Sequence, residues 1–224
     1  MPVYIFERMS VIGGGRGRLV EHIRRKWAPH AEAAHGVRLA GVWATVGSTA
    51  AWPEADALWE MDDWSHFAKA METTHPLEEQ DSYELELWRQ ALDWRSSGHS
   101  MLLTATTFSP SGAQLRALVG PVILYEEVET LPGKMDAYHA ALQQHYLPVA
   151  KQRGMRLFGA YRHAIQPNFG VNLWSFESWD KCREALESEE GDSGVLTWRD
   201  RCKDLLVDQD GWLLAAPPAS LLRT

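Results

Sequence analysis

The chain has 224 residues, of which 45% are hydrophobic and 23% are charged, and this composition excludes disorder as its main state. Its formal net charge of -8 opposes a nucleic-acid-binding role, because phosphate binding normally shows as a basic face. No apolar run approaches the roughly 20 residues that span a bilayer. We therefore expect neither a nucleic acid nor a membrane as a partner.

Two features bear on the compartment. The first ten residues contain Glu7 and no apolar stretch after a basic region, so no signal peptide is expected. Cys182 and Cys202 lack CxxC spacing and fall in sequence that reads as helical. A reduced, cytoplasmic compartment is the simplest prediction.

Hydrophobic periodicity divides the first half into elements. Along the chain these are a strand at 3–9, a Gly-rich turn at 13–17, a helix through Leu19, Ile23 and Trp27, a strand after Gly36, a strand at 57–62, a helix from about 63, and a strand at 101–105. Pro29 is expected near the end of the first helix, because proline disrupts helix continuation. The predicted order is βαββαβ.

The second half repeats that order, which two sequence blocks show. Residues 36–43 and 154–161 both read G-x-R-L-x-G-x-aromatic, and 58–64 matches 173–179. The expected elements are a strand at 122–128, a turn at Pro132-Gly133, a helix through Met135, Tyr138, Leu142 and Tyr146 with Pro148 near its end, a strand after Gly154, a strand at 171–177, a helix from about 178, and a strand at 212–215. The chain therefore reads as an internal duplication.

The duplication predicts an α+β fold of two tandem ferredoxin-like domains, at residues 1–110 and 113–224, with a linker near 109–112. In each unit two helices cover one face of a four-stranded antiparallel sheet. The other face must also be buried, and pressing the two sheets together achieves this. One closed barrel is expected.

The motifs of the second half resemble those of the NIPSNAP family, within the dimeric α/β barrel superfamily. They are Pro132-Gly133-Lys134, the glycines at 154 and 159 with Leu157, and the segment 172–178. The resemblance implies the barrel fold. It does not imply one activity, since the superfamily includes cofactor-free monooxygenases, isomerases, cyclases and heme enzymes.

Glu7 and Glu126 occupy matching positions in the apolar first strands of the two halves. A carboxylate there is costly to bury without a partner. The two alternate in step with Ile5 and Leu124, which the resemblance places facing the barrel interior. In an apolar cavity such a carboxyl would have a raised pKa and could act as a general acid or base. Ion pairing with an arginine stays open as the alternative, the candidates being Arg8, Arg38, Arg156 and Arg162.

Positions that differ between the halves indicate specialisation. Polar residues are richer in the second half, and this favours it as the place of chemistry. The predicted catalytic residues are Glu126, Glu7 and His163; the predicted substrate-binding residues are Tyr125, Arg162, Asn172, Trp174, Trp59, Trp43 and Tyr161. For residues shared by both halves, such as Trp59 and Trp174, a purely structural role is the alternative.

His22, His30 and His35 form no HExxH or Cys/His motif, so neither a metal nor another cofactor is expected. The leading hypothesis is a cofactor-independent enzyme that acts on a small, largely apolar molecule by acid/base chemistry, as an isomerase, cyclase or dehydratase/hydratase. A non-catalytic binding or scaffold protein, and a heme protein with His145 or His163 as ligand, are the alternatives. A homodimer is left open.

Overall fold

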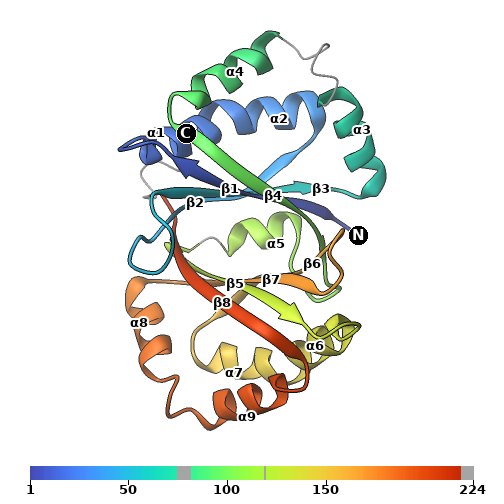
Figure 1. Cartoon of the computed structure of the whole chain (residues 1–224), viewed down its shortest axis with the longest axis vertical. Coiled ribbons are helices and arrows are strands. Elements are labelled where there is room, and N and C mark those ends of the chain that lie inside the picture. Colours follow the sequence, from blue (N-terminus) through green and yellow to red (C-terminus); the bar gives the residue numbers. More distant parts are fainter. Residues whose placement is uncertain (75–81, 119, 218–224) are drawn as a thin grey trace. The chain divides into compact units, whose positions relative to one another are not determined.

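The computed structural model describes residues 1–74, 82–118 and 120–217, and it is an α+β protein (Figure 1). It divides into two compact units, Met1–Leu102 and Leu103–Ala216. Within the described part of the chain, no helix is long and apolar enough to cross a membrane.

The first unit follows the order strand, helix, strand, strand, helix, strand. Its elements are β1 (Val3–Val11), α1 (Arg16–His22), a π-helical turn η1 (Ile23–Trp27), α2 (Ala28–His35), β2 (Arg38–Thr45), β3 (Glu54–Met61), α3 (Trp64–Thr74), α4 (Ser82–Leu92) and the start of β4 (Arg95–Ala105). Strand β3 pairs antiparallel with both β1 and β2. Helices α2, α3 and α4 lie on one side of these strands (Figure 1).

The second unit repeats the plan after a short helix, α5 (Gly112–Ala117). Its elements are β5 (Val122–Thr130), α6 (Met135–Ala141), a π-helical turn η2 (Leu142–Tyr146), α7 (Leu147–Gln152), β6 (Arg156–His163), β7 (Phe169–Phe176), α8 (Trp179–Glu187), α9 (Ser193–Cys202) and β8 (Leu206–Ala215). Strand β5 pairs with β7 and β8, and β6 pairs with β7, all antiparallel.

The hydrogen-bonded strand order is β1-β3-β2-β8-β5-β7-β6-β4, a closed barrel. The predicted fold class, two ferredoxin-like repeats whose antiparallel strands make one barrel, is therefore confirmed. The compact units divide within β4, whose last residues, Leu103 to Ala105, pair with His163 to Tyr161 of β6. The repeat bounds 1–110 and 113–224 stay a prediction.

Two local predictions were wrong. Each second helix is in fact two helices, α3 with α4 and α8 with α9. Pro29 and Pro148 do not end the first helices but lie in the first turn of α2 and α7. A π-helical turn precedes each of these helices, and this explains why proline is tolerated there. The first residues of a new helical segment need no hydrogen-bond partner for their N–H groups within that segment, so the N–H that proline lacks is not missed.

The repeated G-x-R-L-x-G-x-aromatic block has a stereochemical cause in both units. Gly36 and Gly154 follow α2 and α7 with φ of 70° and 74°, a left-handed conformation that favours glycine. At Gly41 an added Cβ would lie 2.1 Å from the Trp43 ring, and at Gly159 it would lie 2.1 Å from the Tyr161 hydroxyl oxygen. A register shift beside each strand glycine marks a β-bulge.

Candidate functional site

In the first unit, a carboxylate and an indole meet on the helix-covered face of the sheet. Glu7 on β1 is paired with Ala57 on β3, so Trp59, two residues further, lies on the same face. The Trp59 Nε1–H donates to Glu7 Oε2 over 2.8 Å. The half-buried carboxylate therefore has a hydrogen-bond donor and lies in an apolar layer.

This pair lies in a cavity of about 460 Å³ between the sheet and the helices, which we call the first-half cavity. The volume lies within the range of small-molecule pockets, about 300–1,000 Å³. Its lining is mostly apolar and aromatic, with Ile5, Trp27, Ala31, Val37, Trp59, Met61, Ala70, Met71 and Trp88. The polar lining residues are Glu7, His35, Thr74 and Glu84.

In the second unit, Glu126 is the counterpart of Glu7 and is held by three donors. Trp174 Nε1 donates to Oε2 over 2.7 Å and Asn172 Nδ2 over 3.3 Å. Gln209 Nε2 donates to Oε1 over 3.1 Å. Asn172 Nδ2 also donates to the Tyr138 hydroxyl over 2.7 Å. The sequence predictions of Glu126, Asn172 and Trp174 thus converge in one cluster.

Burial dominates the electrostatics of this cluster. It raises the pKa of Glu126, while the hydrogen bonds from Trp174 and Asn172 oppose that shift. Burial, with the nearby Glu126 charge, also raises the pKa of Tyr138 well above its usual value. The same two causes raise the pKa of the Cys202 thiol to about 12. Each of these groups is thereby favoured in its neutral form.

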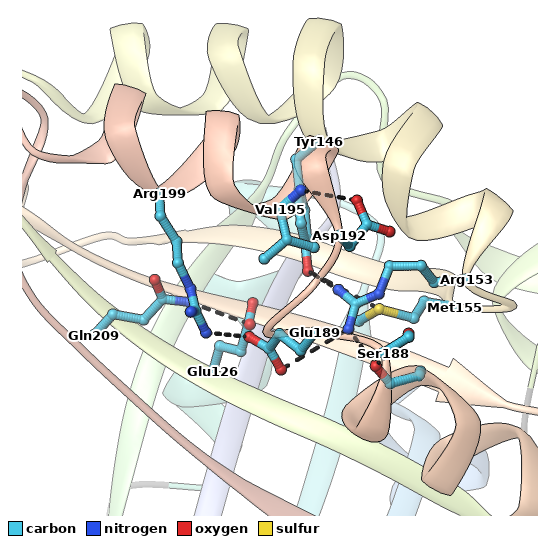
Figure 2. A network of polar contacts seen from close by, with 11 residues as sticks. Glu126, Tyr146, Arg153, Met155, Ser188, Glu189, Asp192, Val195, Arg199 and Gln209 are labelled. Atoms are coloured by element: carbon cyan, nitrogen blue, oxygen red, sulfur yellow. Dashed lines mark hydrogen bonds and ion pairs between the residues drawn. The ribbon is translucent and has the colours of Figure 1, made fainter.

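Charged groups extend the cluster toward α7 and the loop after α8 (Figure 2). Arg153 donates from Nη1 to the Tyr146 hydroxyl over 3.5 Å, and its Nη2 lies 3.8 Å from Glu189 Oε2. Glu189 also pairs with Arg199 at 2.7 Å. The Tyr146 ring stacks on Trp198 at a centroid distance of 5.1 Å. Aromatic rings and ion pairs thus surround this carboxylate.

The two units differ in how much space is left around the carboxylate. The second-unit cluster uses Tyr138, Met155 and Asn172, all buried. The matching residues of the first unit are the smaller Leu19, Val37 and Ala57. Smaller side chains on the same backbone leave unfilled volume, because interiors are otherwise close-packed. Of these three residues Val37 lines the first-half cavity, so the smaller side chain there contributes to its open volume.

The expectation that Glu7 and Glu126 face the barrel interior was wrong. Glu7 shares its face with Ile5, as its alternation predicted, but that face is the one covered by helices of its own unit. Alternation shows which residues share a face of a strand, but it does not show which of the two faces is turned toward the barrel interior. Since both faces of these strands are apolar, the sequence could not choose between them.

Three predicted binding residues lie on the opposite sheet face from the carboxylates. Tyr125 adjoins Glu126 along β5, and its ring stacks on Trp212 at 4.3 Å. Trp43 and Tyr161 are fully buried and cover the bulge glycines of their strands. The structure does not bring these three to either carboxylate.

Arg162 and His163 serve local contacts. Arg162 forms an ion pair with Asp136 at the start of α6. His163 Nδ1 accepts hydrogen bonds from the backbone N–H groups of Ile165 and Gln166, at 3.1 and 3.0 Å. Burial lowers the pKa of His163, so its neutral form is favoured.

The other arginines considered as partners of Glu7 and Glu126 bind other carboxylates. Arg8 pairs with Asp56 at 3.3 Å, Arg38 with Asp62 at 2.6 Å, and Arg156 with Glu177 at 3.4 Å. The observed donors to Glu7 and Glu126 include the indoles of Trp59 and Trp174, a contact that the sequence reasoning did not predict.

Two groups of polar residues escaped the sequence reasoning. His30 and His35 of α2 meet Glu84 of α4, residues whose spacing matches no familiar motif. Asp56 is fully buried and accepts hydrogen bonds from Arg8 and Thr45, and burial raises its pKa to about 6. The sequence of β3 would have indicated only that a carboxylate lies in an apolar strand.

Comparison with solved structures supports the fold. The chain is similar to a candidate monooxygenase from Lactobacillus acidophilus NCFM, with a TM-score of 0.63, 8% identity, and 96% of this chain and 93% of that one covered. It is also similar to an anthrone oxidase-like protein, with a TM-score of 0.63, 10% identity, and 96% and 91% covered. These identities show a shared fold and nothing finer.

Similar structures also include an uncharacterized NIPSNAP domain protein from Burkholderia xenovorans. That protein is 17% identical with a TM-score of 0.39, and the alignment covers 43% of this chain and 95% of that one. No protein-family model matches the chain. No curated protein matches it.

Proposed function

We propose that this chain binds a small, largely apolar organic molecule in the first-half cavity, where Glu7 transfers a proton during an isomerisation, cyclisation, or dehydration or hydration. The observation that carries the proposal is a single glutamate, fixed by an indole, in a cavity of about 460 Å³ with aromatic walls. Burial of apolar ligand surface against Trp27, Met71 and Trp88 supplies the affinity.

The geometry suits a general base. The Trp59 N–H holds Oε2, which orients the carboxylate and leaves Oε1 to take a proton from the ligand. The same indole N–H stabilises the carboxylate form, so the proton can be returned to a second position of the substrate. This return completes an isomerisation or a cyclisation without any group leaving the cavity.

The second-unit counterpart has a different role in this proposal. Asn172, Tyr138 and Gln209 surround Glu126, and their hydrogen bonds lock it into the core. Such a hydrogen-bonded network helps to fix the carboxylate, although Asn172 Oδ1 is buried without a partner among the described residues. Glu126 is therefore the natural control residue for Glu7, since it occupies the matching strand position and is bound by the matching indole, that of Trp174.

Proton exchange tests the proposal without knowledge of the natural substrate. A panel of small aromatic and alicyclic ketones is incubated with the protein in D₂O, and replacement of acidic C–H by C–D is followed by NMR. We expect exchange of those ketones that quench the tryptophan fluorescence of the protein. Glu7→Gln should reduce this exchange by about 100-fold or more and leave binding within about threefold, since general-base contributions are 10²–10⁴-fold.

The control variant is Glu126→Gln, which should exchange at the wild-type rate. Equal exchange by Glu7→Gln and wild type would disprove the catalytic role. Binding without exchange would leave a non-catalytic binding protein, the principal alternative. An absorption spectrum with a Soret band after addition of hemin would instead favour the heme alternative, with His145 or His163 as the ligand.

A further inference from the structure

Two histidines and a glutamate converge at one end of the first-half cavity. His30 and His35 come from α2, and Glu84 comes from α4, 49 residues after His35. Each offers one ligand atom, and the three atoms all lie within 4.8 Å of one another. Glu84 is buried and the two histidines are half-buried. Two imidazoles and a carboxylate are a donor set that suits Zn²⁺.

The hydrogen bonds around His35 indicate which nitrogen is available. The Thr73 hydroxyl donates to the Ala70 carbonyl over 2.9 Å, so toward His35 Nδ1, 3.2 Å away, it acts as the acceptor. In the ring tautomer with the proton on Nδ1, Nε2 is a lone-pair donor that faces Glu84 Oε1, another lone-pair donor, over 3.3 Å. A cation between the two atoms binds both lone pairs; without one, the other tautomer donates from Nε2 to the carboxylate.

The separation of His35 and Glu84 agrees with tetrahedral coordination. Bonds of about 2.0–2.1 Å to a zinc ion, at the tetrahedral angle, place an N and an O ligand about 3.3 Å apart. The observed separation of His35 Nε2 and Glu84 Oε1 is 3.3 Å. The contact from Nδ1 to Thr73 is the outer-sphere hydrogen bond that metal-binding histidines usually make.

His30 supplies the third observation. Its Nε2 is buried and has no hydrogen-bond partner among the described residues. Buried ring nitrogens are normally satisfied, so an unpartnered one on a residue of this cluster calls for an explanation. The matching position of the second unit is Val149, which cannot bind a metal. The cluster therefore belongs to the first unit alone.

We propose that His30, His35 and Glu84 bind one Zn²⁺ ion at the wall of the first-half cavity. This departs from the sequence expectation of no metal, which rested on linear motifs. His35 and Glu84 both line the cavity, so the ion has ligands on its wall. Three protein ligands leave a fourth position for water or for a polar group of the cavity ligand.

Zinc binding is measured on the full, untagged chain after treatment with a chelator. Isothermal titration and elemental analysis should give one equivalent of Zn²⁺, and Zn²⁺ should raise Tm whereas Mg²⁺ should not. Co²⁺ should give the visible absorption of a four-coordinate site. His30→Gln and Glu84→Gln should each lose at least tenfold in affinity and most of the rise in Tm.

The matched control is His99→Ala, which removes an exposed histidine of β4 and should bind as wild type. Glu7→Gln keeps all three ligands and should also bind as wild type, so this proposal and the proposed function fail independently. Thermal melting of each variant without metal shows whether it folds. His30→Gln separates metal binding from folding best, because the Nε2 atom of His30 has no hydrogen bond that the substitution would remove. Absence of Zn²⁺ binding by the wild type, or unchanged binding by His30→Gln, would overturn the proposal.

Discussion

The internal duplication permits one substitution to be made in two equivalent places with opposite expected results. Ala31 on α2 and Ala150 on α7 each lie two residues after the proline in the first turn of their helix. Ala31 lines the first-half cavity, whereas Ala150 is 1% exposed and packs in the second-unit core. Leucine at each position tests whether the cavity is real in solution.

Ala31→Leu adds three carbon atoms, which at about 0.8 kcal/mol each sets an upper limit of about 2.4 kcal/mol on the stabilisation. Some of this is lost to rotamer strain, so a gain of about 1 kcal/mol is expected. Ala150→Leu adds the same atoms to a filled core and should cost about 1–3 kcal/mol. The small helix-propensity difference between alanine and leucine is the same at both positions and cancels.

The assay is urea unfolding followed by circular dichroism, with thermal melting as a second measurement. A change of 1 kcal/mol should move Tm by about 2–4 °C in a chain of this length. The two variants should shift in opposite directions, and Ala31→Leu should also weaken ligand binding. Destabilisation of similar size in both would refute the existence of the cavity, because it would mean that the first unit is as tightly packed as the second.

Three further outcomes are expected. Asp56 has a pKa of about 6 in the folded chain and 3.8 as its reference, so the folded state binds more protons between these values and stability falls as pH rises from about 4 to about 6. The change is at most about 3 kcal/mol, and urea unfolding of Asp56→Asn should lack this part of the pH dependence. Gly36 has a φ of 70°, so Gly36→Ala should lower the unfolding free energy by about 1–2 kcal/mol. Gly14 has an ordinary φ and open space around it, so Gly14→Ala should change that free energy by less than about 0.5 kcal/mol. Equal effects of the two variants would contradict the assignment of Gly36 as a position that requires glycine. Cys182 and Cys202 are buried with raised thiol pKa values, so both should react with a thiol reagent far more slowly in the folded chain than in urea, and rapid reaction of either would contradict the packing.

The sequence predicted the fold well because the repeated residues have local causes that can be seen in the letters. Gly36 and Gly154 mark left-handed positions after a helix, and alternating patterns mark the strands. The predicted helix end near Pro29 was wrong because a π-helical turn starts a new helical segment just before this residue. No local sequence pattern indicates such a turn.

The candidate site could be predicted only in part. The matching carboxylates Glu7 and Glu126 were found because a charge in an apolar strand is conspicuous in any sequence. The face of the sheet on which the two carboxylates lie could not be predicted, since both faces of these strands are buried. The cavity depends on the summed volumes of side chains from several elements, and the meeting of His30 with Glu84 depends on two helices far apart in the chain.

The π-helical turns also record the order of events in the history of this chain. An i→i+5 turn takes up one residue more than the α-helical turn it replaces, and η1 and η2 hold it at the same place in both units. A single ancestral insertion, copied when the unit doubled, is simpler than two independent ones. The carboxylate–indole pairs are ancestral by the same logic. Among the described residues the histidine cluster and the open space beside it occur in the first unit, so they mark a place where the two copies diverged.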